Sequence, residues 1–147
     1  MGKVVGTDAI LYMKYGTTYY PIGCAKSINF ELTTEFIETS VTGSGTFRTY
    51  IPSAKTFSGS LEGVTFLAGP DAPSVAGKFS MGNLYDVVGS LLQVRFYEKD
   101  TNDEHFLQKD CYIYIESISE ASSFDNITTF SLTFKGTGAP VIIYGDI

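Results

Sequence analysis

The residue types that could do chemistry in this chain are few: one histidine, two cysteines and scattered carboxylates. His105 and Cys111 are an even number of positions apart, so on one strand their side chains would share a face, as a cysteine–histidine nucleophile would need. The sequence places no third residue to orient such a pair. A partly exposed strand histidine and a buried core thiol are therefore the favoured interpretation.

A second candidate is a metal site that begins at Asp100. Asp100, Asn102 and Glu104 have the spacing of the first ligands in a calcium-binding loop. Such a loop also needs a glycine at its sixth position and a glutamate at its twelfth, and these positions hold His105 and Cys111. Because Asp and Asn also favour turns, we expect a solvated hairpin tip here.

Three further patterns are weaker. The Gly-Ser-Gly sequence at 43–45 lacks the Gly-Lys-Ser or Gly-Lys-Thr that completes a phosphate-binding loop. Residues 126–128 have the form of a glycosylation sequon, but nothing directs the chain to secretion. Glu31, Glu35 and Glu38 lack a partner environment for acid–base chemistry, so we expect a solvated strand face. The sequence predicts no catalytic residue, no cofactor and no metal site, and hence a protein that is not an enzyme.

The elements that must hold these residues are strands, because apolar and polar residues alternate with a period of two. The alternation covers the segments 27–37, 57–67, 92–97 and 129–135, and it predicts strands with one solvated face. The positions assigned to the buried faces are Ile28, Phe30, Leu32, Phe36, Phe57, Leu61, Leu67, Leu92, Val94, Phe96, Phe130, Leu132 and Phe134.

Other segments complete the predicted fold. Strands at 9–14 and 18–22 flank Gly16, which can take the positive φ of a hairpin turn, and a further strand covers 111–118 after a turn at 99–104. We therefore expect a mainly β fold, an antiparallel β-sandwich or curled barrel of about seven to eight strands with one short α-helix. The helix would be capped by Ser80 and would carry Met81, Leu84, Val88 and Leu91 on one face.

Composition limits the function classes. The 147 residues suffice for one domain with a real core, and 10 Lys and Arg face 16 Asp and Glu. The basic residues are scattered singly, unlike the clustered footprint of nucleic-acid-binding proteins. The sequence has neither an apolar run long enough for a membrane span nor the apolar segment of a signal peptide, so we expect cytoplasmic synthesis. Cys24 and Cys111 are then expected as free thiols, although the sequence leaves their redox state open.

Two segments are rich in contact-forming residues. The loop 39–56 is long for a hairpin connection and holds residue types enriched in interfaces. The segment 139–147 has four consecutive apolar residues, which would either add to another sheet's edge or pair within their own domain. The residues expected to make contacts are Phe47, Arg48, Tyr50, Ile51, Val141, Ile142, Ile143 and Tyr144.

Three short motifs carry a resemblance to a known family: Phe-Arg-Thr-Tyr-Ile-Pro at 47–52, Ser-Leu-Glu-Gly at 60–63 and Phe-Lys-Gly-Thr-Gly at 134–138. With the order of elements from Asp8 to Pro140, the chain resembles the major tail protein, or tail tube protein, of long-tailed bacteriophages. The resemblance implies the tail-tube fold and a structural virion protein. Its subunits would oligomerise into stacked, usually hexameric rings that form the channel for DNA passage.

The resemblance also implies a division of the chain. A single tail tube domain would span 1–147, with an N-terminal arm at 1–6, an inter-ring loop at 39–56 and a C-terminal arm at 139–147. The contact residues named above would then join subunits and rings. The expected partners are further copies of the chain and other tail proteins (tape measure, tail terminator, baseplate or tip), in a virion assembled in the bacterial host cytoplasm.

The polar side of the 27–37 strand is the expected lining of the lumen. Asn29, Glu31, Thr33 and Glu35 share this side, and their charge would repel DNA phosphates within the screening length of about 8 Å. DNA would then slide through without specific binding.

Two other classes remain open from the sequence. The tube protein of a contractile injection or secretion machine would have a similar fold and would also form rings. A β-sandwich module that binds a carbohydrate or a peptide would instead be a monodisperse monomer. The host, the type of tail and the ring symmetry are not fixed by the sequence.

Overall fold

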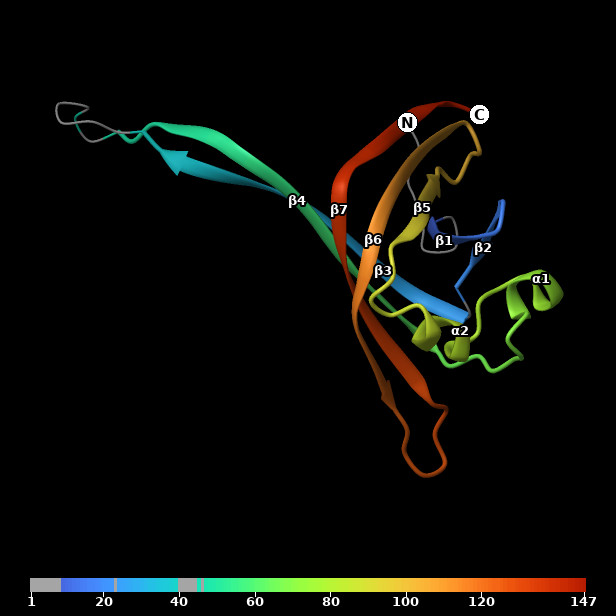
Figure 1. Cartoon of the computed structure of the whole chain (residues 1–147). Coiled ribbons are helices and arrows are strands. Elements are labelled where there is room, and N and C mark those ends of the chain that lie inside the picture. The colour runs from blue at the N-terminus through green and yellow to red at the C-terminus, as the bar shows by residue number, and fades with distance from the viewer. Residues whose placement is uncertain (1–8, 23, 40–44, 46) are drawn as a thin grey trace.

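The computed structural model describes residues 9–22, 24–39, 45 and 47–147. These residues form seven strands and two short helices (Figure 1). The elements are β1 (Ala9–Tyr15), β2 (Thr18–Pro21), β3 (Cys24–Glu38), β4 (Tyr50–Val64), α1 (Ala72–Ala76), α2 (Met81–Asp86), β5 (Leu92–Lys99), β6 (His105–Ala121) and β7 (Thr129–Asp146).

The strands form one antiparallel sheet in the order β2-β1-β5-β6-β7-β4-β3. The sheet curls until strands distant in this order meet: the ring of Phe30 in β3 packs edge-on against Phe96 in β5, with centroids 6.1 Å apart, although three strands separate them. The curled, mainly β architecture confirms the predicted fold class.

The core fills the inside of this curl. The inward positions of each strand alternate with outward ones, as the period of two requires, and α2 closes the interior with Met81 and Leu84. The buried core residues are Leu11, Met13, Ile22, Phe57, Leu61, Phe79, Met81, Leu84, Val94, Phe96, Cys111, Ile113, Ile115, Phe130, Leu132 and Phe134.

Two glycines let the strands approach the aromatic core closely. A Cβ at Gly136 would overlap the ring of Phe57, and a Cβ at Gly59 would overlap the Asn29 carbonyl oxygen and the ring of Phe134. Only the absence of a side chain leaves room for these rings. Gly59 of β4 and Gly136 of β7 are therefore part of the core packing.

The predicted helix is confirmed at its start and was drawn too long. Ser80 caps α2 through a reciprocal capping box with Asn83, but the helix ends at Asp86, and Gly89 has a φ of 85°. Val88 and Leu91 therefore lie outside α2 with exposed side chains. The prediction also missed α1, whose five residues are too few to show a helical repeat.

Two strand predictions need correction in extent. Leu67, expected on a buried strand face, lies beyond the end of β4 at Val64 and is exposed. β6 begins at His105, well before the predicted start at Cys111. Within the described part of the chain, no helix is long and apolar enough to cross a membrane.

Candidate assembly surfaces

β3 and β4 extend beyond the body of the sheet as a two-stranded ribbon, defined here as residues 32–38 of β3 and 50–57 of β4. β4 pairs with β7 only from Ser58 onward, where Ser58 lies opposite Lys135, so the ribbon residues pair only with one another in the described structure. Figure 1 shows the ribbon projecting away from the helices and from the upper part of β7. An isolated two-stranded ribbon is only marginally stable in water. The ribbon therefore needs a further contact surface.

One face of the ribbon carries an apolar stripe, formed by Leu32, Phe36 and Tyr50. Leu32 lies opposite the buried Phe57, so the stripe continues the core face of the sheet into solvent. Leu32 is 53% exposed and Phe36 is 61% exposed. The rings of Phe36 and Tyr50 meet edge to face with centroids 6.5 Å apart. Exposed apolar side chains that lie together in this way mark interaction surfaces.

The sequence analysis expected Leu32 and Phe36 on a buried strand face, and this was wrong. The alternation was correctly recognised, but this part of β3 pairs only with β4, and no third strand lies beside the pair in the described structure. The available signal was the length of the alternating segment 27–37, which already exceeds the usual strand length of about 3–10 residues. Ile37 was likewise not identified; it lies opposite Ile51 on the other face of the ribbon, and both side chains are exposed.

The contact residues expected between 47 and 51 lie together at or beside the ribbon. Phe47 is 83% exposed, and Arg48 forms an ion pair of 2.8 Å with Glu38. Tyr50 and Ile51 belong to the first positions of β4, so the strand begins inside the segment expected as the loop 39–56. Thr34 pairs with Lys55 and Phe36 pairs with Pro52, so β4 has one residue more than β3 between these pairs. This β-bulge shifts the register, and the pairing with β3 continues to Tyr50.

The other expected contact residues lie elsewhere. Val141–Tyr144 continue β7 and pair with β6 inside the same domain, from Val141 opposite Asp110 to Tyr144 opposite Leu107. The pairing answers the question left open by the sequence in favour of a strand within the domain. All four side chains are nevertheless exposed, and the edge of β7 from Gly136 onward has no second partner strand among the described residues.

Below the ribbon, β3, β4, β7 and β6 form a four-stranded segment, defined here as residues 25–31, 58–64, 129–135 and 114–121. β3 is the last strand of the sheet, and β5 pairs with β6 only as far as Ile113. Both outer edges of the four-stranded segment therefore lack a partner strand in the described structure. Open edges present unpaired N–H and C=O groups that favour pairing with another chain.

The outer face of the four-stranded segment is polar. Its side chains point away from the buried Phe134, Leu132 and Leu61, since neighbours along a strand face opposite sides. The hydroxyl oxygens of Ser117 and Thr133 are 2.6 Å apart across the strands. Paired positions form three rows across the strands: Ser119, Ser131, Glu62 and Ser27; Ser117, Thr133, Ser60 and Asn29; and Tyr114, Lys135, Ser58 and Glu31.

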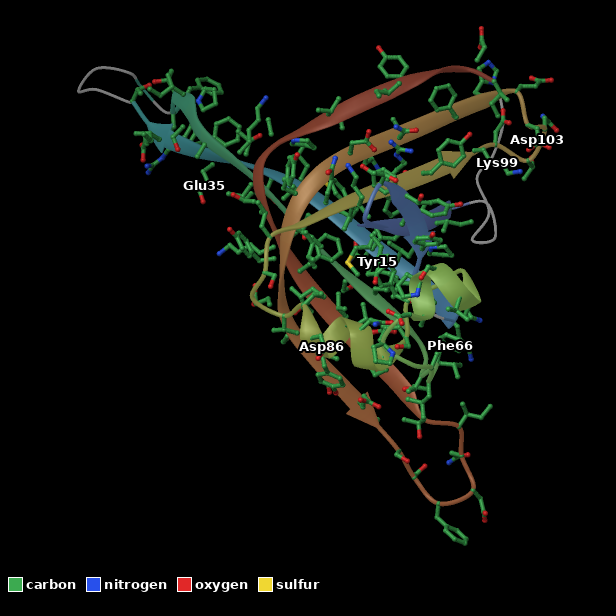
Figure 2. All side chains as sticks on the ribbon, turned by 45° about the vertical axis from the view of Figure 1, so that its right-hand side comes forward. Tyr15, Glu35, Phe66, Asp86, Lys99 and Asp103 are labelled. Carbon is green, nitrogen blue, oxygen red and sulfur yellow. The ribbon has the colours of Figure 1, made fainter. Side chains whose placement is uncertain are left out.

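The residues expected to line a lumen begin on this face. Asn29 and Glu31 lie in its rows, and Thr33 continues them on the ribbon opposite Thr56. Glu35 lies at the register irregularity of the ribbon, and Figure 2 shows it far from the helices. All four expected side chains are exposed. The face also carries Lys135, a basic residue that the sequence analysis did not place there.

The residues considered for nucleophilic chemistry are far apart. Cys111 is buried, and burial raises the pKa of its thiol to about 11, which keeps it protonated. His105 lies at the other end of the same strand stretch, about 20 Å away at 3.3 Å per residue. The His105 ring contacts carboxylates instead: Nδ1 is 3.1 Å from Asp100 and Nε2 is 3.2 Å from Asp146.

The segment expected as a hairpin tip is a turn organised by Asp100. This carboxylate is only 4% exposed and accepts hydrogen bonds from the backbone N–H groups of Glu104 (2.8 Å) and His105 (3.4 Å). The bond from Glu104 is the main cause that lowers the pKa of Asp100 below its ordinary value. Ligand atoms of Asp100, Glu104 and His105 lie within 4.8 Å of one another. Since Asp100 is engaged in the turn, the arrangement is explained by the hairpin alone.

The remaining sequence patterns are structurally simple. Of the Gly-Ser-Gly sequence, only Gly45 is described, and residues 43 and 44 lie outside the described part of the chain. Asn126, the first residue of the sequon, donates from its backbone N–H to the Ser123 carbonyl in a turn. The Cys24 side chain also lies outside the described part of the chain, and Cys111 is a free thiol.

Neither a protein-family model nor a curated protein sequence matches the chain. Several solved structures share its fold. A chain from the virion of a native gene transfer agent particle superposes with a TM-score of 0.66 at 18% identity, covering 95% of this chain and 98% of that one. A chain of the SPP1 tail tube superposes with a TM-score of 0.67 at 12% identity, covering 99% and 80%.

A third structure comes from a different kind of particle. A chain of the anti-feeding prophage baseplate, solved with 6-fold symmetry, superposes with a TM-score of 0.60 at 8% identity, covering 92% of this chain and 90% of that one. At such identities the likeness concerns the fold. The chain therefore has the fold of tail tube proteins, which confirms the fold that the sequence motifs implied.

Proposed function

We propose that the chain is a structural subunit of a phage-type tail tube and that its function is assembly. The observation that carries this proposal is the four-stranded segment, which combines two open edges with one polar face. A monomer with two open edges and an exposed apolar ribbon would be prone to aggregate. Association of identical copies would cover both features.

Ring closure would occur edge to edge. The outer edge of β3 in one copy would pair with residues 114–121 of β6 in the next, so that the four-stranded segments join into a closed barrel. A closed barrel has no edges, and a head-to-tail contact of this kind closes into a ring. Six copies are the proposed number, because the tail of an empty gene transfer agent particle was solved with C6 symmetry and has the same fold, with a TM-score of 0.65 at 18% identity.

Stacking of rings would use the projecting elements. The apolar stripe of the ribbon, together with Phe47 and Arg48, would contact the next ring, and Val141–Tyr144 would add the open β7 edge to the interface. In this proposal the inter-ring loop 39–56 includes the first residues of β4, from Tyr50. The single domain 1–147 is completed by two arms, residues 139–147 and residues 1–6, of which the latter lie outside the described part of the chain.

The channel would be lined by the polar face. Ser and Thr hydroxyls dominate its rows, and Glu31 and Glu62 add negative charge beside Lys135. Carboxylates repel DNA phosphates over about one screening length, roughly 8 Å in physiological salt. DNA would pass such a wall without specific binding.

The subunit would act in the virion, with tape measure, terminator and baseplate or tip proteins as partners, and without catalysis.

The direct test is electron microscopy of the purified chain in negative stain over a series of rising concentrations. The proposal predicts rings first and stacked tubes at higher concentration, with a polar channel of constant width. A monomer that persists at high concentration contradicts it and favours a monomeric β-sandwich binding module.

A second candidate is the tube protein of a contractile injection machine. The likeness to a chain of the anti-feeding prophage baseplate favours this candidate. Both candidates predict rings, so the discriminating experiment is identification of the proteins that co-purify with assembled tubes from producing cells. A contractile sheath protein around the tube supports the injection machine or a contractile phage tail, and a bare tube packed with DNA supports a non-contractile phage tail.

A further inference from the structure

A second projection lies at the opposite end of the molecule from the ribbon. β6 and β7 are joined by residues 122–128, called the apex here, which lie beyond the last pairing of β7 with β4 at Thr129 and Val64. β4 runs from the ribbon toward this end and β7 runs away from it. The apex, which joins β6 and β7, and the ribbon, which is formed by β3 and β4, therefore lie at opposite ends of the four-stranded segment. Figure 1 shows the apex as the lowest loop of the molecule.

The apex exposes two large apolar side chains. Phe124 is 92% exposed, and Ile127 is also exposed, although neither belongs to a strand. Sequence analysis did not identify them, because the surrounding Ser, Asp and Asn residues indicate an ordinary solvated turn. An aromatic side chain at the tip of a projecting hairpin is instead suited to enter a partner's pocket.

The conformation of the apex is fixed by its own hydrogen bonds. The Asn126 N–H donates to the Ser123 carbonyl (3.1 Å), and the Asn126 side-chain amide donates to the Ser123 hydroxyl (2.8 Å). Asp125 adopts the left-handed region with a φ of 67°, which Asp tolerates better than most residues. The base of the apex is bonded to the residue that follows β4, since the Thr65 backbone N–H donates a hydrogen bond to the Thr128 carbonyl (3.0 Å). Phe124 is thus presented on a preorganised turn, which lowers the entropic cost of binding.

The ribbon offers the matching chemistry. Its apolar stripe lies at the opposite end of the four-stranded segment from the apex, and Lys55 lies between Leu32 and Phe36 in register, opposite Thr34. The apex carries Asp125 directly after Phe124. If copies stack with their polar faces in line, the apex of one copy arrives at the ribbon of the next, with an aromatic group facing the stripe and a carboxylate facing an ammonium group.

We infer that the apex is a stacking contact whose partner is a second copy of this chain, with Phe124 seated on the ribbon stripe of the neighbouring ring. This inference rests on the proposed tube assembly and adds a specific contact to it. The contact is heterologous, because different surfaces of the two copies meet, and such a contact repeats without limit along a filament.

The first test compares Phe124→Ser with Val75→Ser, a matched removal of an exposed apolar side chain on α1. Both variants should fold with the wild-type melting temperature. Phe124→Ser should still form rings but should raise the concentration needed for tubes by about tenfold or more, the effect expected for loss of one anchoring side chain. Val75→Ser should leave that concentration unchanged. Tubes of Phe124→Ser at the wild-type concentration would overturn the inference.

The second test asks which surface the apex meets. Two variants are assembled together into tubes, one with Phe124→Cys and one with Phe36→Cys, and both also carry Cys24→Ser. The tubes are then treated with a short bismaleimide, which cross-links two thiols that lie close together. The inference predicts a covalent dimer in the mixture that neither variant gives alone. Tubes that form without this dimer would overturn it while leaving the proposed function intact, whereas wild-type chains that never form rings would overturn the proposed function itself.

Discussion

The body of the molecule and its ribbon use the same residue types for opposite purposes. In the body, Leu61 and Phe134 on adjacent strands are enclosed by the curled sheet. In the ribbon, Leu32 and Phe36 continue the same face of the same sheet, and more than half of each side chain is exposed. The difference is that β7 pairs with β4 only from Ser58 onward, so no third strand accompanies the ribbon in the described structure.

The apolar residues of this chain are divided between two interiors. One interior forms within the subunit, and we propose that the other forms between subunits. Removal of an apolar side chain should therefore cost folding stability in the body and assembly in the ribbon. An exchange of these two effects between the body and the ribbon would contradict the division.

The largest effect is expected in the body. Leu61→Ala removes a fully buried side chain between β3 and β7, and should lower the free energy of unfolding by about 2–5 kcal/mol. Urea denaturation of the monomer measures this change. Leu67→Ala is the matched control, because Leu67 is exposed beyond β4, and it should change stability by less than about 0.5 kcal/mol.

The ribbon should show the reverse pattern. Leu32→Ser combined with Phe36→Ser removes most of the stripe, and should leave the unfolding free energy of the monomer within about 1 kcal/mol of wild type, since surface changes have small effects. Light scattering and microscopy should show that tubes no longer form. A large loss of monomer stability together with normal tubes would show that the stripe belongs to the subunit's own core.

A smaller effect is expected on the polar face of the same strand. Glu31→Lys with Glu35→Lys reverses two charges in the proposed channel lining, and should leave tubes intact while slowing DNA passage, because lysines attract phosphates. The readout is the rate of genome ejection from particles that carry the variant. Unchanged ejection kinetics would remove these two residues from the lining.

The smallest effect concerns the turn at Asp100. Its pKa is lowered from 3.8 mainly by the Glu104 N–H, so its charged form stabilises the fold above that pH, and this contribution is lost as pH falls through the lower folded-state pKa. Asp100→Asn should lower the melting temperature near neutral pH, and the gap to wild type should narrow under strongly acidic conditions. A gap that widens on acidification would contradict the assignment.

Much of the fold could be predicted because alternation is a local signal. The period of two located β3, β5 and β7, and Ser80 with Asn83 fixed the start of α2. Exposure could not be read in the same way, since Leu32 and Phe36 alternate like core residues. They are exposed because β7 pairs with β4 only from Ser58 onward and then continues beside β6. The open edges are likewise a property of strand order, which no local pattern encodes.

Phe124 illustrates the same limit at the other end of the molecule. Its neighbours predict a turn correctly, and the turn is present. Its exposure depends on where β4 and β7 stop pairing, at Val64 and Thr129, because no strand accompanies β6 and β7 beyond that point in the described structure. Sequence reasoning therefore finds the element and misses its exposure.

The central claim is that the two open edges of the four-stranded segment pair between copies. Hydrogen exchange of backbone amides, compared between the monomer and assembled particles, tests it most directly. We expect protection to rise in residues 25–31 of β3 and 114–121 of β6, while β5, which is already paired on both sides, should change little. Assembled particles in which those two edges exchange as fast as in the monomer would contradict the account.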